Sequence, residues 1–195
     1  MTYWSGIVNE ADLCHIGGTP HGLTDVLGLR SEEIDGLCKG ETNHFLPLEK
    51  NAFFMKDRYE CSHLCDLVHL DGAKPLMTYA ENFYKGYPAL TVNNYGSGLA
   101  YYVCADAETD FYLDLYRNII SEQHIPPVMD SIPEGIEISS RTIKNTEYVF
   151  VQNFTEEPIC IRLPNESEIL FGCYDGTIQG YSSVIYRKKA QLPQK

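Results

Sequence analysis

A chain of 195 residues with 44% hydrophobic and 22% charged residues suits one ordinary globular domain or two small ones, and this balance excludes a largely disordered protein. The formal net charge of −12 comes from 27 acidic against 15 basic residues, which excludes a surface attracted to nucleic acid or to an anionic membrane. No apolar run approaches the roughly 20 residues of a membrane helix, and no signal peptide is recognisable. We therefore expect a cytoplasmic protein with no nucleic-acid and no membrane partner.

The seven cysteines are expected to be reduced thiols, because their number is odd and no export signal accompanies them. Cys61 and Cys65 are four residues apart, with His63 and His69 close by, so a metal site is one interpretation of this stretch. Small buried side chains are the favoured interpretation, because no CxxC pair is present. We predict no metal and no cofactor.

The first third of the chain is expected to contain short elements. Residues 2–8 are typical of a strand that ends in a loop, and residues 23–29 favour a short helix. Residues 31–34 place a serine before two acids, which is the pattern of a helix N-terminus. Residues 39–58 favour one or two edge strands, and residues 60–70 fit a helix or a strand equally well.

The middle of the chain predicts three strands and then the best helix. The strands are expected at Ala73–Tyr79, Ala89–Val92 and Leu99–Ala105, with a hairpin closed at Asn94–Gly98. A helix is predicted over Asp106–His124, with Asp106 as its cap and the paired prolines 126 and 127 as its end. One core-facing stripe is expected, made of Phe111, Tyr112, Leu115, Tyr116 and Ile119.

After Pro133 the pattern changes to short alternating segments separated by turn residues, with no helix between them. This predicts a small antiparallel β domain, with its boundary after residue 127, so that the domains are 1–127 and 128–195. The tail 188–195 is expected to fray. The predicted strands are Ile136–Ser140, Tyr148–Asn153, Ile159–Leu163, Glu168–Phe171 and Ser182–Arg187.

Four stretches, taken together and in this order, resemble the C-terminal part of glycoside hydrolase family 42 β-galactosidases. They are TYWSGIVNEADL (2–13), GLTDVLGLRSEEID (22–35), ECSHLCDLVHLDGAKPLMTYAENFYKGYPALTVNNYGSGLAYYVCA (60–105) and EYVFVQNFT (147–155). The resemblance is collinear and covers nearly the whole chain.

The resemblance implies a fold and the absence of a catalytic centre. In that family a (β/α)8 barrel carries the chemistry, and a flavodoxin-like trimerisation domain and a small β domain follow it. The chain resembles the second half of the trimerisation domain and the complete β domain. The predicted fold class is therefore α/β, a partial flavodoxin-like or amidotransferase-like three-layer unit, followed by a small all-β antiparallel domain. The family's two catalytic glutamates are barrel residues, so no catalytic, cofactor-binding or metal-binding residue is carried over.

The residues themselves offer two candidate carboxylate pairs for a retaining glycosidase, which needs two carboxyl groups about 5–5.5 Å apart. Glu10 and Asp12 lie in the first loop, where a solvated turn is the favoured interpretation. Glu32 and Glu33 are neighbours in the predicted helix, so their side chains diverge and cannot flank one bond.

Trp4, Cys104 and the neighbours Cys14 and His15 are further candidates for chemistry. Trp4, the only tryptophan, could stack on a sugar, although packing is the favoured role. Cys104 lies between a predicted strand and helix, where a nucleophilic thiol sits in amidotransferase-like folds, but it lacks the flanking glycines. Cys14 and His15 are sequence neighbours, which rarely form a productive dyad. Whether Trp4 or Glu10 reaches an active site stays open.

The leading hypothesis is a non-catalytic assembly region of a family 42 β-galactosidase, whose full-length enzyme hydrolyses terminal β-D-galactosides. This region would hold subunits together and cover the mouth of the barrel, and it is expected to be inactive alone. Its expected partners are copies of itself, as a trimer or through pairing of edge strands, or a separate polypeptide that carries the barrel. The alternative is a free-standing α/β plus β module that binds carbohydrate or protein.

Overall fold

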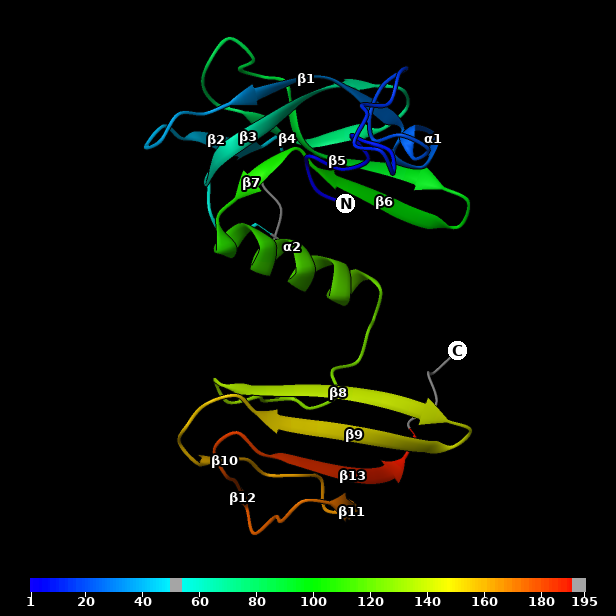
Figure 1. Cartoon of the computed structure of the whole chain (residues 1–195), viewed down its shortest axis with the longest axis vertical. Coiled ribbons are helices and arrows are strands. Elements are labelled where there is room, and N and C mark those ends of the chain that lie inside the picture. The colour runs from blue at the N-terminus through cyan, green and yellow to red at the C-terminus, as the bar shows by residue number, and fades with distance from the viewer. Residues whose placement is uncertain (50–53, 191–195) are drawn as a thin grey trace. The chain divides into compact units, whose positions relative to one another are not determined.

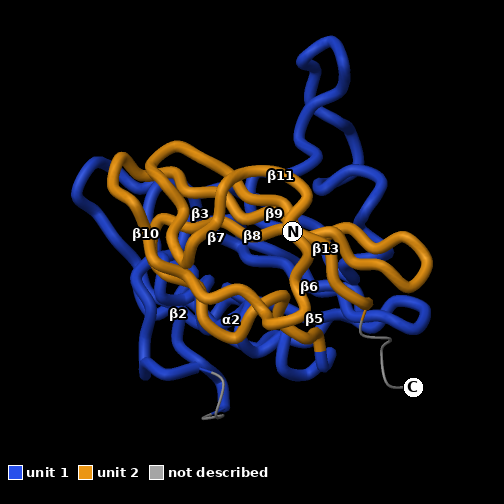
Figure 2. Tube along the Cα trace, turned by 90° about the horizontal axis from the view of Figure 1, so that it is seen from below, with its two compact units in different colours: residues 1–124 blue, residues 125–195 orange. Residues whose placement is uncertain are grey.

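The computed structural model describes residues 1–49 and 54–190, which form two compact units, residues 1–124 and residues 125–195 (Figures 1 and 2). The boundary between the two units falls after His124, whereas the sequence predicted a domain boundary after Pro127. Neither helix in the described ranges is long and apolar enough to cross a bilayer. Each unit has its own hydrophobic core.

Unit 1 is a seven-stranded sheet with two helices, of which α1 (Thr24–Leu27) is a single turn and α2 (Thr109–Glu122) is the main one. The sheet order is β1-β3-β2-β4-β5-β6, and β7 pairs with β3. The strands are β1 (Leu29–Gly36), β2 (Asn43–Pro47), β3 (Tyr59–Leu70), β4 (Lys74–Tyr79), β5 (Pro88–Tyr95), β6 (Gly98–Val103) and β7 (Ala105–Ala107).

The predicted three-layer α/β unit is wrong. Every pair of named strands in unit 1 is antiparallel, whereas a three-layer unit needs parallel strands joined by crossover helices. Most successive strands are joined by turns, and only α2 among the described elements is long enough to cover a sheet face. Unit 1 is therefore mostly β.

Several local predictions about unit 1 also change. Residues 31–34 lie in β1 and not in a helix, because their backbone pairs with β3, with a register shift between Ser31 and Glu33. Residues 60–70 form strand β3. Within 39–58 the structure gives the strand β2, and residues 50–53 of this stretch lie outside the described residues. The helix α2 begins after Glu108 instead of at Asp106, which lies in β7.

The three central strands and their hairpin are confirmed. Strands β4, β5 and β6 follow one another in the sheet, and Tyr95 pairs with Gly98 across a two-residue turn. The turn contains Gly96, whose φ of 59° suits a residue without a side chain.

Helix α2 closes the core of unit 1 through its apolar stripe. Phe111 is buried and makes edge-to-face contacts with Phe45 at 5.2 Å and with Tyr59 at 5.6 Å between ring centroids. Leu115 is buried one turn later, as predicted, but Tyr116 is 57% exposed, so its place in the stripe was wrong. Stability of α2 therefore depends on the packing of one face, as expected for a helix of 14 residues.

Unit 2 is the predicted small antiparallel β domain. Its main sheet has the order β11-β13-β9-β8, and a separate pair joins β10 to β12. The alternating residues Val149 and Val151 of β9 face the core with Val184 and Tyr186 of β13. The predicted frayed tail is partly wrong because β13 extends to Lys189, and residues 191–195 lie outside the described residues. The strands are β8 (Ile136–Ile143), β9 (Thr146–Asn153), β10 (Ile159–Cys160), β11 (Glu168–Phe171), β12 (Thr177–Ile178) and β13 (Ser183–Lys189).

Candidate functional site

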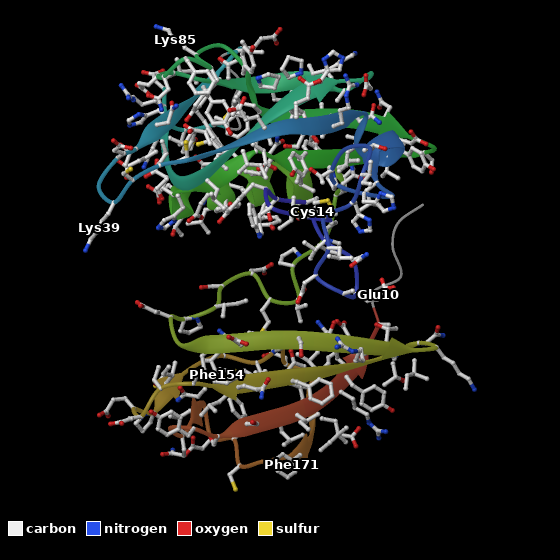
Figure 3. All side chains as sticks on the ribbon, turned by 45° about the horizontal axis from the view of Figure 1, so that its top comes forward. Glu10, Cys14, Lys39, Lys85, Phe154 and Phe171 are labelled. Carbon is white, nitrogen blue, oxygen red and sulfur yellow. The ribbon has the colours of Figure 1, made fainter. Side chains whose placement is uncertain are left out.

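Glu10 and Asp12 lie in an exposed turn of the N-terminal loop of unit 1, and Figure 3 shows Glu10 away from the sheet of that unit. The side-chain oxygen of Asn9 organises this turn by accepting hydrogen bonds from the amides of Ala11 at 2.9 Å and Leu13 at 3.1 Å. Both carboxylates are exposed, so the turn has the character of a solvated loop and lacks the enclosed setting of an acid–base pair.

Glu32 and Glu33 are both exposed on β1, in a strand instead of the expected helix. The guanidinium of Arg30 binds Glu32 at 3.1 Å and Asp71 at 2.7 Å, which makes this a surface charge cluster. Exposed ion pairs of this kind contribute little to stability. They hold β1 against the turn that follows β3, and they bring together no catalytic pair.

Cys104 is completely buried between β6 and β7, and another strand follows it instead of a helix. Burial raises the pKa of its thiol well above the usual value, and the nearby Asp66 adds to that rise. A thiol that is neither ionised nor accessible cannot act as a nucleophile. The structure therefore gives Cys104 a packing role.

The cysteines and histidines of β3 do not converge on one point. Cys61 and Cys65 are buried, whereas the His63 side chain is 75% exposed and pairs with Asp106 at 2.7 Å. Among the described residues, no three His, Cys, Asp or Glu side chains are grouped as a metal site requires. Ser62 and Asp106 both contact Nδ1 of His63, at 3.4 and 2.7 Å. A hydrolase triad would use both ring nitrogens, so this is no triad.

Cys14 and His15 are also not a dyad. Cys14 is exposed and pairs through its backbone with Val8, while the ring of His15 stacks on His21 with centroids 3.8 Å apart. These contacts fold the N-terminal loop back on itself. The loop presents Ile16 almost completely to solvent, at 98% exposure. An ordered loop that exposes an isoleucine is a candidate contact for a partner.

Two buried aspartate–tyrosine pairs lie in the core of unit 1, and sequence reasoning missed both. Oδ2 of Asp66 accepts a 2.6 Å hydrogen bond from the hydroxyl of Tyr102, and Oδ2 of Asp114 accepts one of 2.6 Å from Tyr59. Burial raises the pKa of Asp66, against the opposing effects of Tyr102 and of the Trp4 backbone. All four side chains are buried, with exposures of 0–5%, so the pairs are structural. An aspartate within the apolar run Leu64–Val68 was the available signal for Asp66.

The outer face of α2 carries an exposed apolar row that is the best candidate interaction surface of unit 1. Leu113, Tyr116 and Ile120 are 54%, 57% and 47% exposed, and their spacing places them on one side of the helix. We call these three residues the α2 row. It lies apart from the stripe that faces the core, so the helix is apolar on two sides.

A hollow of about 390 Å³ lies on the outer face of the main sheet of unit 2, and a larger one of about 920 Å³ lies elsewhere in this unit, beside Met129 and Arg162. Phe150, Phe171 (Figure 3) and Ile185 supply the apolar lining of the smaller hollow, while Arg141 and Gln152 supply polar groups. Aromatic and hydrogen-bonding groups at one place suit a small polar ligand with an apolar face. The residues around it are part of strands β8, β9, β11 and β13.

Comparison with known families defines the class of protein. Residues 1–126 match the family described as "Beta-galactosidase trimerisation domain", and residues 135–188 match "Beta-galactosidase C-terminal domain". The chain therefore belongs to glycoside hydrolase family 42, as its trimerisation and C-terminal domains. The described residues contain no barrel, so the catalytic region of that family lies outside this chain.

The relatives are longer proteins. The chain is 41% identical over 157 residues to the β-galactosidase Pbg of Clostridium perfringens, covering 80% of this chain and 23% of the relative. It is 38% identical over 162 residues to the β-galactosidase BgaA of a Planococcus species, covering 83% and 24%. The chain thus spans about a quarter of the length of these relatives.

Solved structures agree with this assignment. A β-galactosidase from Rahnella sp. R3 matches 97% of this chain with a TM-score of 0.75 and 38% identity, over 28% of its own chain. A β-galactosidase from Bacillus circulans sp. alkalophilus matches 96% with a TM-score of 0.77 and 33% identity, also over 28%. The likeness extends across both units.

Proposed function

We propose that this chain is a non-catalytic assembly region of a family 42 β-galactosidase, in which a barrel outside this chain hydrolyses terminal β-D-galactosides. The observation that carries the proposal is the succession of the two family matches, trimerisation domain and then C-terminal domain, along one chain. The arrangement of the polar residues supports it, because the carboxylates and thiols considered for catalysis are scattered, solvated or buried.

The assembly partner proposed here is a second and third copy of the chain. The α2 row supplies an apolar surface for such contact, and the exposed Ile16 of the N-terminal loop supplies a second. The net charge of −12 opposes association, but screening confines that repulsion to about 8 Å at physiological salt. Short-range apolar contact should therefore prevail. In the assembled enzyme the same region would cover the mouth of the barrel, in the cytoplasm.

Multi-angle light scattering of the full chain at 1–100 µM tests the proposal. We expect a mass of three chains, or of two where edge strands pair. A well-folded monomer across the whole range would contradict self-assembly. In that case the partner would be a separate polypeptide with the barrel, and mixing with that polypeptide should then produce a complex.

The smaller hollow of unit 2 favours one second function, a carbohydrate-binding module. Phe150 and Phe171 offer aromatic faces for a sugar, and Arg141 offers hydrogen bonds to hydroxyl groups. Chemical-shift changes confined to these residues on titration with galactose or lactose would support that function. Unchanged spectra at millimolar sugar would reject it.

A further inference from the structure

The N-terminus of the chain is bound to the open edge of the sheet of unit 1 as a short parallel strand. Thr2 and Val103 form a parallel bridge. The amide of Val103 donates to the carbonyl of Met1 at 3.0 Å, and the amide of Tyr3 donates to the carbonyl of Val103 at 2.7 Å. Strand β6 is the last strand in the sheet order, so these residues begin an additional strand beside it.

The terminal amine of Met1 occupies the position that a backbone amide would have in a longer parallel strand beside β6. It donates to the carbonyl of Tyr101 at 2.9 Å, which continues the pattern made by Tyr3 and Val103 two residues further on. Burial lowers the pKa of this amine, which shows that the position is unfavourable for a charge. A neutral backbone amide would fit it better.

The same edge continues beyond Met1 with free hydrogen-bonding capacity. Backbone groups of successive residues in a strand point to alternate sides. Because the carbonyls of Tyr101 and Val103 face away from β5, the amide of Tyr101 and both backbone groups of Leu99 face the same way. The hydrogen bonds between the N-terminal residues and this edge extend along β6 from Val103 only as far as the carbonyl of Tyr101. An open strand edge of this kind is a template for another strand.

An apolar groove of about 520 Å³ lies beside this edge. Met1, Leu99 and Ala100 line it along the edge, while Val26 of α1 and Ile119 of α2 line it from the helices. In a parallel strand the residues before Met1 would lie beside Ala100 and Leu99, and alternate side chains would enter the groove with that of Met1. The groove and the free edge therefore match the same ligand, an extended peptide with apolar residues at every second position.

We propose that the edge of β6 from Leu99 to Tyr101 accepts, as a parallel strand in line with Met1–Tyr3, an extended segment of the polypeptide that precedes this region in the longer family 42 relatives. The source of the segment rests on the proposed function, since this chain spans only about a quarter of the length of its relatives and matches the families of the trimerisation and C-terminal domains. The segment completes the sheet and links the assembly region to the rest of the protein by backbone pairing.

The test extends the full chain by four residues. One version carries Val-Thr-Val-Thr directly before Met1, which places valines at the groove positions. The matched version carries Pro-Thr-Pro-Thr, which keeps apolar side chains there, but its second proline lacks the amide that would donate to the carbonyl of Leu99. Both are released from a cleavable tag, so that no initiator residue remains. Hydrogen exchange of residues 98–103 is measured by mass spectrometry at two protein concentrations, together with the sedimentation coefficient.

We expect the valine extension to slow exchange in residues 98–103 by at least tenfold and the proline extension to leave it unchanged. Leu99→Lys should remove this gain, while Leu170→Lys, at an equally exposed leucine of unit 2, should not. Equal exchange in both extended versions would overturn the proposal. Protection that appears in the unextended chain and grows with concentration would also overturn it, because a second copy would then occupy the edge. Equal exchange in both extended versions is independent of the mass measured by light scattering, whereas concentration-dependent protection would accompany a mass of two chains, so failure here and failure of the assembly proposal are distinguishable.

Discussion

Tyr102 donates a 2.6 Å hydrogen bond to Oδ2 of Asp66 inside a closed core, where the two residues are 1% and 0% exposed. The backbone of Trp4 acts with Tyr102 to lower the pKa of Asp66 against burial, while Oδ1 of Asp66 is buried without a hydrogen-bond partner among the described residues. One buried carboxylate therefore connects β3 to β6. A buried carboxylate is costly unless it is hydrogen-bonded, so the single bond from Tyr102 should be important for the stability of unit 1.

Replacing Tyr102 with phenylalanine should lower the free energy of unfolding of unit 1 by about 1–3 kcal/mol at pH 7, because a buried carboxylate loses its donor. The hydroxyl lowers the pKa of Asp66 against the effect of burial, so the variant's folded state has a higher Asp66 pKa. The loss should be complete above that pKa and should shrink as pH falls below it, since protonated Asp66 needs no donor. Urea denaturation at pH 4–8 measures the difference in the free energy of unfolding between the variant and the unmodified chain. Tyr95→Phe, at an exposed tyrosine, is the control, and a loss independent of pH would contradict the mechanism.

Thiol accessibility should divide the seven cysteines into two groups. Cys61, Cys65 and Cys104 are buried, and the remaining four, Cys14, Cys38, Cys160 and Cys173, are exposed and free. Titration of the native protein with a thiol reagent should therefore count four fast groups, and titration in denaturant without reductant should count seven. Fewer than six in denaturant would contradict the expectation of reduced cysteines.

Gly172 and Gly176 offer a matched test of close packing in unit 2. Both have positive φ, 85° and 104°, but a Cβ at Gly172 would lie 2.3 Å from the carbonyl oxygen of Ser183, whereas nothing lies within 4 Å at Gly176. Gly176→Ala should cost about 1–2 kcal/mol from backbone strain. Gly172→Ala should cost clearly more, because backbone of β13 must move. The stability of unit 2 is measured by denaturation, with hydrogen exchange of the amides of residues 146–153 as the probe. Equal losses of stability in the two variants would contradict the close packing at Gly172.

The purified chain should not hydrolyse an aryl β-galactoside, because the carboxylates considered for catalysis do not form an enclosed pair. Glu10→Gln should leave the background rate unchanged. Turnover by the pure chain that disappears in Glu10→Gln would contradict this prediction and would restore Glu10 as a catalytic candidate.

The elements that the sequence predicted correctly are those whose buried residues recur at one regular spacing, either that of a helix or that of a strand. In α2, Phe111 and Leu115 recur at helical spacing, and in unit 2 the alternation of Val149 and Val151 follows the pleat. The prediction failed at β1, where Ser31, Glu32 and Glu33 have the composition of a helix start but lie at a register shift in an edge strand. The resemblance-based expectation of a three-layer unit failed because pairing direction is decided between distant strands.

The candidate surfaces were only partly predictable for a related reason. Asp66 and Tyr102 are 36 positions apart, and only the fold brings them into contact. The prediction that Tyr116 faces the core failed because α2 is apolar on two sides. Spacing alone does not tell which of the two sides is buried. The pairing of Met1 with Tyr101 likewise depends on β6 being the last strand of the sheet.

Changing the α2 row should separate the subunits without unfolding the chain. Leu113→Glu combined with Ile120→Glu places two charges on a row that is about half exposed, so the folded monomer loses little packing. In an oligomer that buries this row, each charge would lose its hydration without a partner, which is costly. We expect the mass by light scattering to fall to that of one chain at 10 µM, with an unchanged near-ultraviolet circular dichroism spectrum.

The matched control is Ile143→Glu combined with Leu170→Glu, two exposed apolar residues of unit 2 with comparable exposure of 61% and 46%. This variant carries the same added charge, so it separates contact from general repulsion. It should keep the mass of the unmodified oligomer. If both variants dissociate equally, net charge and not the α2 row controls assembly. If the α2 variant stays oligomeric, the subunits meet elsewhere, and Ile16→Glu in the N-terminal loop is the next variant to dissociate them.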